Sequence, residues 1–238
     1  IVSNITYDSW QYMKNLVLSN RALYGVDYHL NKVVQFTDND GNLISEYVDF
    51  GSVDSMKISS FLKSKGYSNQ NMIDFKKDEG CIQINGQTVH LNHILQEKER
   101  LRVLIRETQS PSAIQPVQYP LDIVYEDEDL LVLNKVAGMP IHPSRLHPMD
   151  SLGNALAWYF KGQEFVYRCI NRLDRDTSGL TVVAKHPVSG AILSQMVASK
   201  NQMQREYIAV VDGILEKKKG TVSAPIARRE SECLLRVV

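Results

Sequence analysis

The densest group of side chains that could react chemically lies in residues 172–180, RLDRDTSGL. Asp174 and Asp176 stand two positions apart, and an aspartate carboxylate serves as a nucleophile or as a proton acceptor. A reference aspartate has a pKa of about 3.9 and is therefore ionised at neutral pH. A nearby arginine such as Arg172 keeps a carboxylate ionised even when it is buried. The segment therefore predicts carboxylate chemistry.

The residues alone leave several interpretations of this segment open. Asp174 and Asp176 could form the acid–base pair of a glycosidase, although an aromatic content of 8% gives little support for a sugar-binding cleft. Asp174 could instead form a structural ion pair with Arg172 or Arg168. We interpret Asp176 as a capping or turn residue.

The sequence on both sides of the charged run predicts two strands that hold it. Residues 165–170 are rich in apolar side chains, and residues 181–184, TVVA, have the composition of a second strand. Residues 177–179 carry turn chemistry. We therefore expect the charged residues on a loop between two core strands, a place where active sites are common.

A compact helix–helix–strand unit is predicted over residues 53–107. Gly66 is expected to stop its first helix and Ser68 to cap the next one. Asn85–Gly86 is a strong hairpin-turn signal. The expected elements are helices around 58–62 and after 68, and strands at 81–84 and 101–105.

The rest of the chain divides into three parts. Residues 1–50 form an N-terminal segment of unknown role, with a helix expected around 9–20 and a hairpin whose strands are 32–36 and 43–48. Residues 109–120 contain three prolines and are expected to form an extended linker. From residue 121 strands and helices alternate, with helices expected at 152–160 and 191–199.

Three stretches, in order, resemble the RluA-type pseudouridine synthases, which isomerise uridine in RNA. They are 121–144 (LDIVYEDEDLLVLNKVAGMPIHPS), 172–180 (RLDRDTSGL) and 205–213 (REYIAVVDG). The resemblance implies an α+β fold whose catalytic domain, residues 121–238, has a mixed, mainly antiparallel sheet. Residues 62–87 resemble the small alpha-L RNA-binding fold, so residues 51–108 are expected to be a small α/β RNA-binding domain.

The same resemblance implies roles for individual residues. Asp174 would be the catalytic carboxylate, Arg172 would contact phosphate or fill the space left by an extruded base, and Tyr207 would stack on the flipped uracil. Lys135 would support the catalytic loop. The lysines of the small domain would face RNA phosphates, and these are Lys63, Lys65, Lys76 and Lys77. No cofactor or metal is implied, because the isomerisation involves neither net redox change nor hydrolysis.

The chain departs from the family pattern at several points. Asn171 stands where the family often has histidine, and Val136 stands where proline usually follows the lysine. The family's later basic motif does not occur before Val238, so we expect a C-terminally truncated domain that is inactive alone. We also expect the strands around Ile170 and Leu180 to lack pairing partners. A non-catalytic RNA-binding protein that keeps the fold remains an alternative.

Composition narrows the class of protein further. The 238 residues are 43% hydrophobic and 23% charged, which is ordinary for a globular protein of one to two domains. No apolar run approaches the roughly 18 residues of a membrane span, and residues 1–20 lack the features of a signal peptide. Cys81, Cys169 and Cys233 form no CxxC pair, which favours reduced thiols and a cytoplasmic location.

The charge balance bears on the partner. The net charge is zero, from 27 basic and 27 acidic residues, which argues mildly against RNA binding. Residues 1–50 hold 3 basic and 6 acidic side chains, whereas residues 51–120 hold 9 and 7. The excess of acidic residues therefore lies in residues 1–50, the part of the chain that does not resemble the family. We expect ribosomal or transfer RNA as the partner, no DNA, no membrane and a monomer. No metal is expected at the histidines, which lack companion cysteines or clustered acids: His90, His93, His142 and His147.

Overall fold

The computed structural model describes most of residues 32–214 and a few residues beyond them. The described residues are 32–37, 43–48, 50, 55–107, 113–199, 203, 205–214, 219–221, 223–224, 227–228 and 236–237. Contacts divide the chain into two units, residues 2–204 and residues 205–238 with residue 1. The helix expected around residues 9–20 lies outside the described residues, as does Cys233.

Five antiparallel strands form the first sheet, in the order β1-β2-β5-β3-β4. The strands are β1 (Lys32–Thr37), β2 (Leu43–Val48), β3 (Ile82–Ile84), β4 (Gln87–Thr88) and β5 (Arg100–Ile105). Pairing of β1 with β2 confirms the predicted N-terminal hairpin. Asn85 and Gly86 have φ angles of 50° and 83°, as the predicted two-residue turn between β3 and β4 requires.

Strand β2 joins the N-terminal hairpin to the small unit. It pairs with β5 along its whole length, from Leu43 opposite Ile105 to Val48 opposite Arg100. Residues 43–48 therefore belong to the same sheet as the unit predicted from residue 53. Nothing in the sequence around residues 43–48 predicts this pairing with β5.

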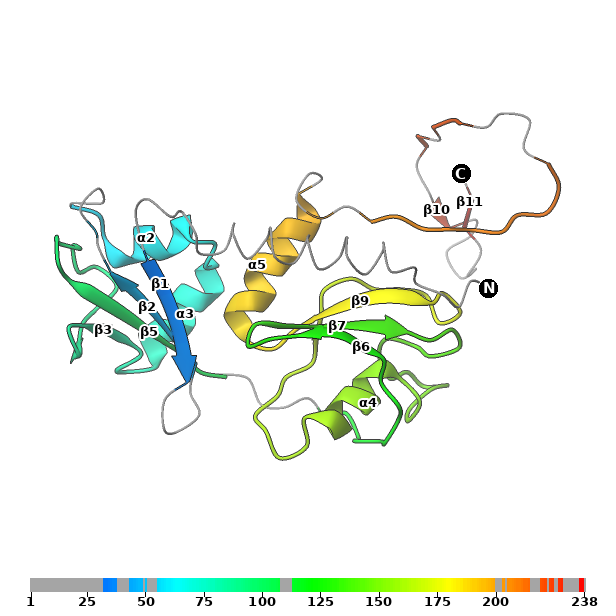
Figure 1. Ribbon diagram of the computed structural model, residues 1–238, viewed down its shortest axis with the longest axis horizontal. Coiled ribbons are helices and arrows are strands. Elements are labelled where there is room, and N and C mark those ends of the chain that lie inside the picture. The colour runs from blue at the N-terminus through cyan, green and yellow to red at the C-terminus, as the bar shows by residue number, and fades with distance from the viewer. Residues whose placement is uncertain are drawn as a thin grey trace. The chain divides into compact units, whose positions relative to one another are not determined.

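Two helices, α2 (Ile58–Ser64) and α3 (Asn69–Lys77), accompany this sheet (Figure 1). Gly66, with a φ of +89°, follows the end of α2 as predicted. The Ser68 hydroxyl accepts from the Asn71 amide in a capping box, which confirms the predicted cap of α3. The shared core includes these fully buried side chains: Phe50, Ile58, Phe61, Leu62, Leu95, Leu101 and Val103.

Four antiparallel strands form the second sheet, in the order β6-β7-β9-β8. They are β6 (Ile123–Glu126), β7 (Leu130–Lys135), β8 (Arg168–Cys169) and β9 (Gly179–Ala184). The strand expected at 165–170 is thus shorter than predicted, because only two of its residues pair in register with β9. Strand β9 pairs on both sides, with Leu180 opposite Asn134 of β7. The expectation of an unpaired edge at Leu180 was therefore wrong.

Helices α4 (Leu152–Tyr159) and α5 (Pro187–Ala198) cover opposite faces of this second sheet (Figure 1). Leu131 and Leu133 of β7 pack in the cluster that contains α4 residues, whereas Leu130 and Val132 pack with α5 residues. Both faces of β7 are therefore buried, which explains its continuous apolar run. The two helices confirm the predictions for 152–160 and 191–199.

Residues 113–120 contain no helix or strand, as expected of the proline-containing linker. They are nevertheless attached to α4: the Asn154 side-chain amide donates to the Gln115 carbonyl at 2.8 Å, and the Val117 amide donates to the Asn154 carbonyl at 3.1 Å. In the unit that begins at Arg205, β10 (Ala227–Arg228) pairs with β11 (Arg236–Val237).

Candidate functional site

The charged run lies on the loop that joins β8 to β9, which confirms the predicted position between two core strands. The buried Asn171 connects both ends of this loop. Its side-chain amide donates to the Leu180 carbonyl at 2.9 Å, and its side-chain oxygen accepts from the Val182 amide at 2.7 Å. The residue that departs from the family's usual histidine thus holds the loop to the sheet.

Lys135 holds the middle of the same loop. Its side chain is buried, and its ammonium group donates to the carbonyls of Val136, Met139 and Arg175 at 2.9, 2.9 and 3.0 Å. These three acceptors use all three of its protons. Burial lowers the pKa of Lys135, and the carboxylates of Asp176 and Asp174 raise it. The structural role predicted for Lys135 agrees with these contacts.

Asp174 itself presents an exposed side chain on this loop. Its carbonyl accepts from the Thr177 amide at 3.1 Å, so its backbone is fixed by a turn. Among the described residues, the carboxylate of Asp174 makes no hydrogen bond or ion pair, and neither does the guanidinium of Arg172. Arg168 pairs instead with Glu107, at 2.7 Å. The structural ion pair considered for Asp174 is therefore not formed with either arginine.

Asp176 differs from Asp174 in its pairing. It accepts two hydrogen bonds from Arg175, both 2.9 Å long, and these bonds lower the pKa of Asp176. A glycosidase acid must hold a proton near neutral pH and needs a raised pKa. Asp176 is therefore unsuited to be the acid of a two-carboxylate glycosidase. Asp176 lies in a turn as expected, but its carboxylate binds a side chain rather than capping a backbone amide.

The other predicted site residues lie farther along the chain or in the small unit. Tyr207 belongs to the unit that begins at Arg205, in a stretch without helix or strand, and is 61% exposed. Its role beside Asp174 stays a prediction. The lysines predicted to bind RNA, all at or just after the ends of α2 and α3, are Lys63, Lys65, Lys76 and Lys77.

Local structure gives these lysines a second explanation. Cations are favourable at helix C-termini, where Lys63, Lys76 and Lys77 lie. The Lys65 ammonium lies 5.4 Å from the centroid of the Phe61 ring. Their contact with RNA therefore stays a prediction.

One loop beside the charged run was not identified from sequence, namely residues 142–150 between β7 and α4. The ring centroid of His142 lies 5.1 Å from that of Tyr167. Burial lowers the pKa of His142, and so does the charge of Arg172. His147 pairs with Asp150 at 2.7 Å. The only sequence signal for this loop is a polar, proline-containing stretch that begins at the end of the first motif.

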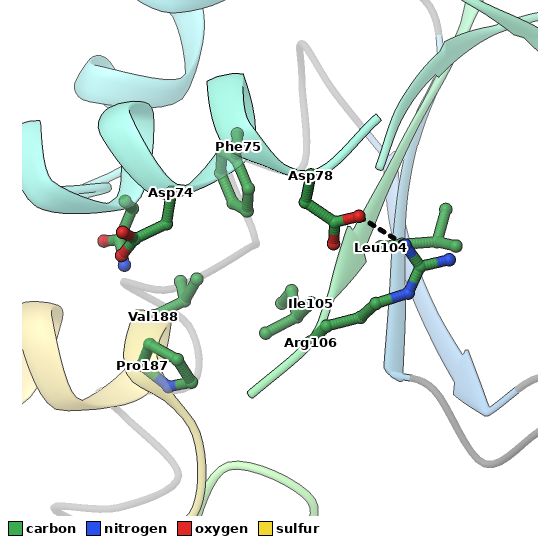
Figure 2. Close-up of a pocket in the computed structure, with 9 residues that line it drawn as sticks. Asp74, Phe75, Asp78, Leu104, Ile105, Arg106, Pro187 and Val188 are labelled. Atoms are coloured by element: carbon green, nitrogen blue, oxygen red, sulfur yellow. Dashed lines mark hydrogen bonds and ion pairs between the residues drawn. The ribbon is translucent and has the colours of Figure 1, made fainter. Parts of the chain in front are cut away.

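A pocket elsewhere in this unit carries no reacting group (Figure 2). It lies where α3 and β5 face the first turn of α5, with Phe75, Pro187 and Val188 in its lining. Of its three charged residues, Asp78 and Arg106 form an ion pair of 2.7 Å, and Asp74 accepts from the Gln70 side-chain amide at 2.9 Å. We therefore place the candidate site at the β8–β9 loop and not in this pocket.

The described residues include no group of three histidines, cysteines or acids able to hold a metal ion. No helix among them is both long and apolar enough to cross a membrane.

Cys81 and Cys169 are free thiols, and burial raises the pKa of each to about 11. Neither thiol is therefore an activated nucleophile at neutral pH.

Comparison with known proteins agrees with this geometry. Residues 129–237, which include Lys135, the charged loop and Tyr207, match the RNA pseudouridylate synthase family. The chain is 38% identical over 186 residues to the uncharacterized RNA pseudouridine synthase YjbO of Bacillus subtilis, covering 77% of this chain and 65% of the relative. It is 36% identical over 143 residues to ribosomal large subunit pseudouridine synthase D of Haemophilus influenzae, covering 59% and 43%.

The fold is therefore a mainly antiparallel α+β domain. Its candidate site is an exposed aspartate on a loop that hydrogen bonds hold in place. The chain is thus similar to the RNA pseudouridylate synthase family over residues 129–237, the family that its three motifs resemble. It spans less than two thirds of the length of both relatives.

Proposed function

We propose that this protein converts uridine to pseudouridine in RNA, with the Asp174 carboxylate as its reacting group. One observation carries the proposal. Asp174 is exposed and makes no side-chain pair among the described residues, on a loop that Lys135 and Asn171 fix by hydrogen bonds. Fixed geometry with a free carboxylate is what a nucleophile or proton acceptor needs.

The chemistry is a balanced isomerisation. The bond between uracil nitrogen and the ribose carbon breaks, the uracil turns, and a bond from its C5 carbon to the same ribose carbon forms. The proton on C5 leaves to a base, and the released nitrogen gains one. Asp174 acts as a nucleophile toward sugar or base, or as the proton acceptor. Electrons and atoms balance without a cofactor or metal.

The proposed substrate is a structured ribosomal or transfer RNA in the cytoplasm, bound by a monomer. Support for ribosomal RNA comes from the relative named for the large ribosomal subunit. A base inside a stacked strand must be extruded before its ribose bond can be attacked. Tyr207 would then stack on the extruded uracil. The four lysines near the ends of α2 and α3 would hold phosphates by charge.

Release of tritium tests this function directly. The full-length protein is incubated with host RNA that was transcribed with tritium at C5 of uracil, because loss of the C5 proton then releases tritium into water. We expect steady, catalytic release. RNA binding without any release would instead support a non-catalytic RNA-binding protein that keeps the fold.

A further inference from the structure

Residues 142–150 form a small hairpin with an apolar tip. The amide and carbonyl groups of Ser144 and His147 bond to each other at 3.0 and 3.1 Å, which leaves Arg145 and Leu146 as the two tip residues. Leu146 is 86% exposed. Turn positions usually hold glycine, proline, asparagine or aspartate for backbone reasons, and neither tip residue has a positive φ. Backbone geometry therefore does not explain a leucine at this tip.

The base of this hairpin is firmly attached to the domain. The amides of Leu152 and Gly153 donate to the carbonyls of Pro140 and Ile141 at 2.8 and 3.1 Å. The Tyr167 hydroxyl donates to the Ile141 carbonyl at 2.9 Å. The domain therefore presents the tip from a fixed base, and its backbone loses little further freedom on contact with a partner.

The hairpin runs beside the loop of Asp174. Just before it, the Gly138 amide donates to the Arg175 carbonyl at 2.9 Å. Two residues of the hairpin also interact electrostatically with the charged loop: Arg172 contributes to the lowered pKa of His142, and His147, next to the tip, contributes to the lowered pKa of Asp176. The hairpin therefore neighbours the loop that carries the candidate reacting group.

We propose that Leu146 is a wedge that enters the base stack next to the target uridine, while Arg145 contacts a neighbouring phosphate. This inference rests on the proposed function, since only an enzyme acting on a base must unstack it. Apolar side chains inserted between base steps unstack them, as in proteins that kink duplexes. A largely exposed leucine loses its contact with water on insertion, which is favourable. The exposed cation beside it suits the phosphate backbone.

A two-substrate comparison tests the wedge in the full-length protein. The modified uridine found by mapping host RNA is placed in two short RNAs, one paired within a helix and one single-stranded. For Leu146→Ala we expect kcat/KM to fall about ten- to a hundredfold on the paired RNA, because unstacking costs a few kcal/mol. The single-stranded RNA should change less than about twofold, since little unstacking is needed.

Two matched variants separate the tip from the rest of the hairpin. Leu146→Met keeps an apolar side chain of similar volume and should restore most of the paired-RNA rate. Met149→Ala removes another exposed apolar residue of the same hairpin, 42% exposed, and should leave both rates unchanged. Equal loss on both RNAs for Leu146→Ala, or no loss on either, would overturn the wedge and leave Leu146 an ordinary exposed leucine.

A fluorescence measurement separates failure of the wedge from failure of the proposed function. The paired RNA carries 2-aminopurine beside the uridine, whose fluorescence rises when neighbouring bases unstack. Binding of Asp174→Asn should raise the fluorescence without turnover, and adding Leu146→Ala should remove that rise. A rise that persists in the double variant contradicts the wedge. A wedge-dependent rise with a wild-type protein that forms no pseudouridine would contradict the enzyme function alone.

Discussion

The two sheets of this protein treat their charged residues in opposite ways. In the first sheet, buried Glu46 of β2 accepts from both Arg100 and Arg102 of β5, at 2.7 and 2.5 Å. At the β8–β9 loop of the second sheet, Asp174 and Arg172 stay unpaired among the described residues. A buried charge needs a partner to offset its desolvation. A charge that is exposed and unpaired on a rigid loop is solvated by water and stays available to a bound partner.

Lys135 shows that the second sheet also satisfies its buried charges. Its ammonium group contacts only backbone carbonyls, including that of Arg175. The buried cation therefore stabilises the loop without neutralising Asp174 by a direct ion pair. The contrast predicts that substitutions in the first sheet change stability, whereas substitutions at the loop change turnover.

The largest effect is expected from the two aspartates of the loop. Asp174→Asn keeps the size of the side chain and removes its charge, so we expect tritium release to fall at least about thousandfold with the fold intact. Asp176→Asn serves as the matched control, because Asp176 pairs with Arg175, and its rate should stay within about tenfold of wild type. Equal losses for both variants would remove the distinction between the two carboxylates.

The second-largest effect, on both stability and turnover, is expected from substitution of Lys135. Lys135→Met removes three hydrogen bonds and leaves buried carbonyls without a donor, which should lower the free energy of unfolding by about 3 kcal/mol. Turnover per folded molecule should fall as well, since the Arg175 carbonyl is released. Urea unfolding measures the first and tritium release the second. Lys161→Met is the control, because Lys161 is exposed and lies over the Trp158 ring; a similar loss there would contradict the role of Lys135.

A smaller effect is expected in the first sheet. Glu46→Gln leaves Arg100 and Arg102 without their shared carboxylate, which should lower the free energy of unfolding by about 1 to 2 kcal/mol. Turnover per folded molecule should not change, because this pair serves the sheet. Exposed Glu164→Gln provides the control in the same urea titration. A drop in turnover with unchanged stability for Glu46→Gln would contradict a purely structural role for this pair in the first sheet.

The smallest effect is expected from the lysines of α2 and α3. Replacing all four with alanine should make RNA binding less dependent on salt, by roughly 0.7 to 0.9 in log–log slope for each lost phosphate contact. Filter binding at several salt concentrations measures the slope. Lys161→Ala is the control. It removes a single charge just after α4, away from α2 and α3 in the sequence. An unchanged slope in the four-lysine variant would leave these residues as solvated helix ends.

Local signals predicted much of this structure. The cap at Ser68, the turn at Asn85–Gly86 and the helices α4 and α5 follow from residues that are neighbours in sequence. The pairing of β2 with β5 did not, because it joins segments more than 50 residues apart. No local pattern reports such a register.

The candidate site shows the same division. The motif identified Asp174 and its loop, and the family pattern gave Lys135 a supporting role. The sequence did not reveal that the Asn171 side chain, just after β8, would form two hydrogen bonds with β9, or that residues 142–150 would lie beside the loop. These two features depend on how the β7–α4 and β8–β9 connections pack against each other. Such packing joins segments that are far apart in the sequence, so local sequence patterns do not predict it.

Pseudouridine formation by this protein should depend on the Asp174 carboxylate. The most direct measurement maps pseudouridines at single-nucleotide resolution in host RNA from three strains, which carry the wild-type gene, a deletion, or Asp174→Asn at equal protein level. We expect one or a few positions to be modified only with the wild-type gene and to be lost equally in the other two strains. Those positions keeping wild-type modification with Asp174→Asn would contradict this expectation.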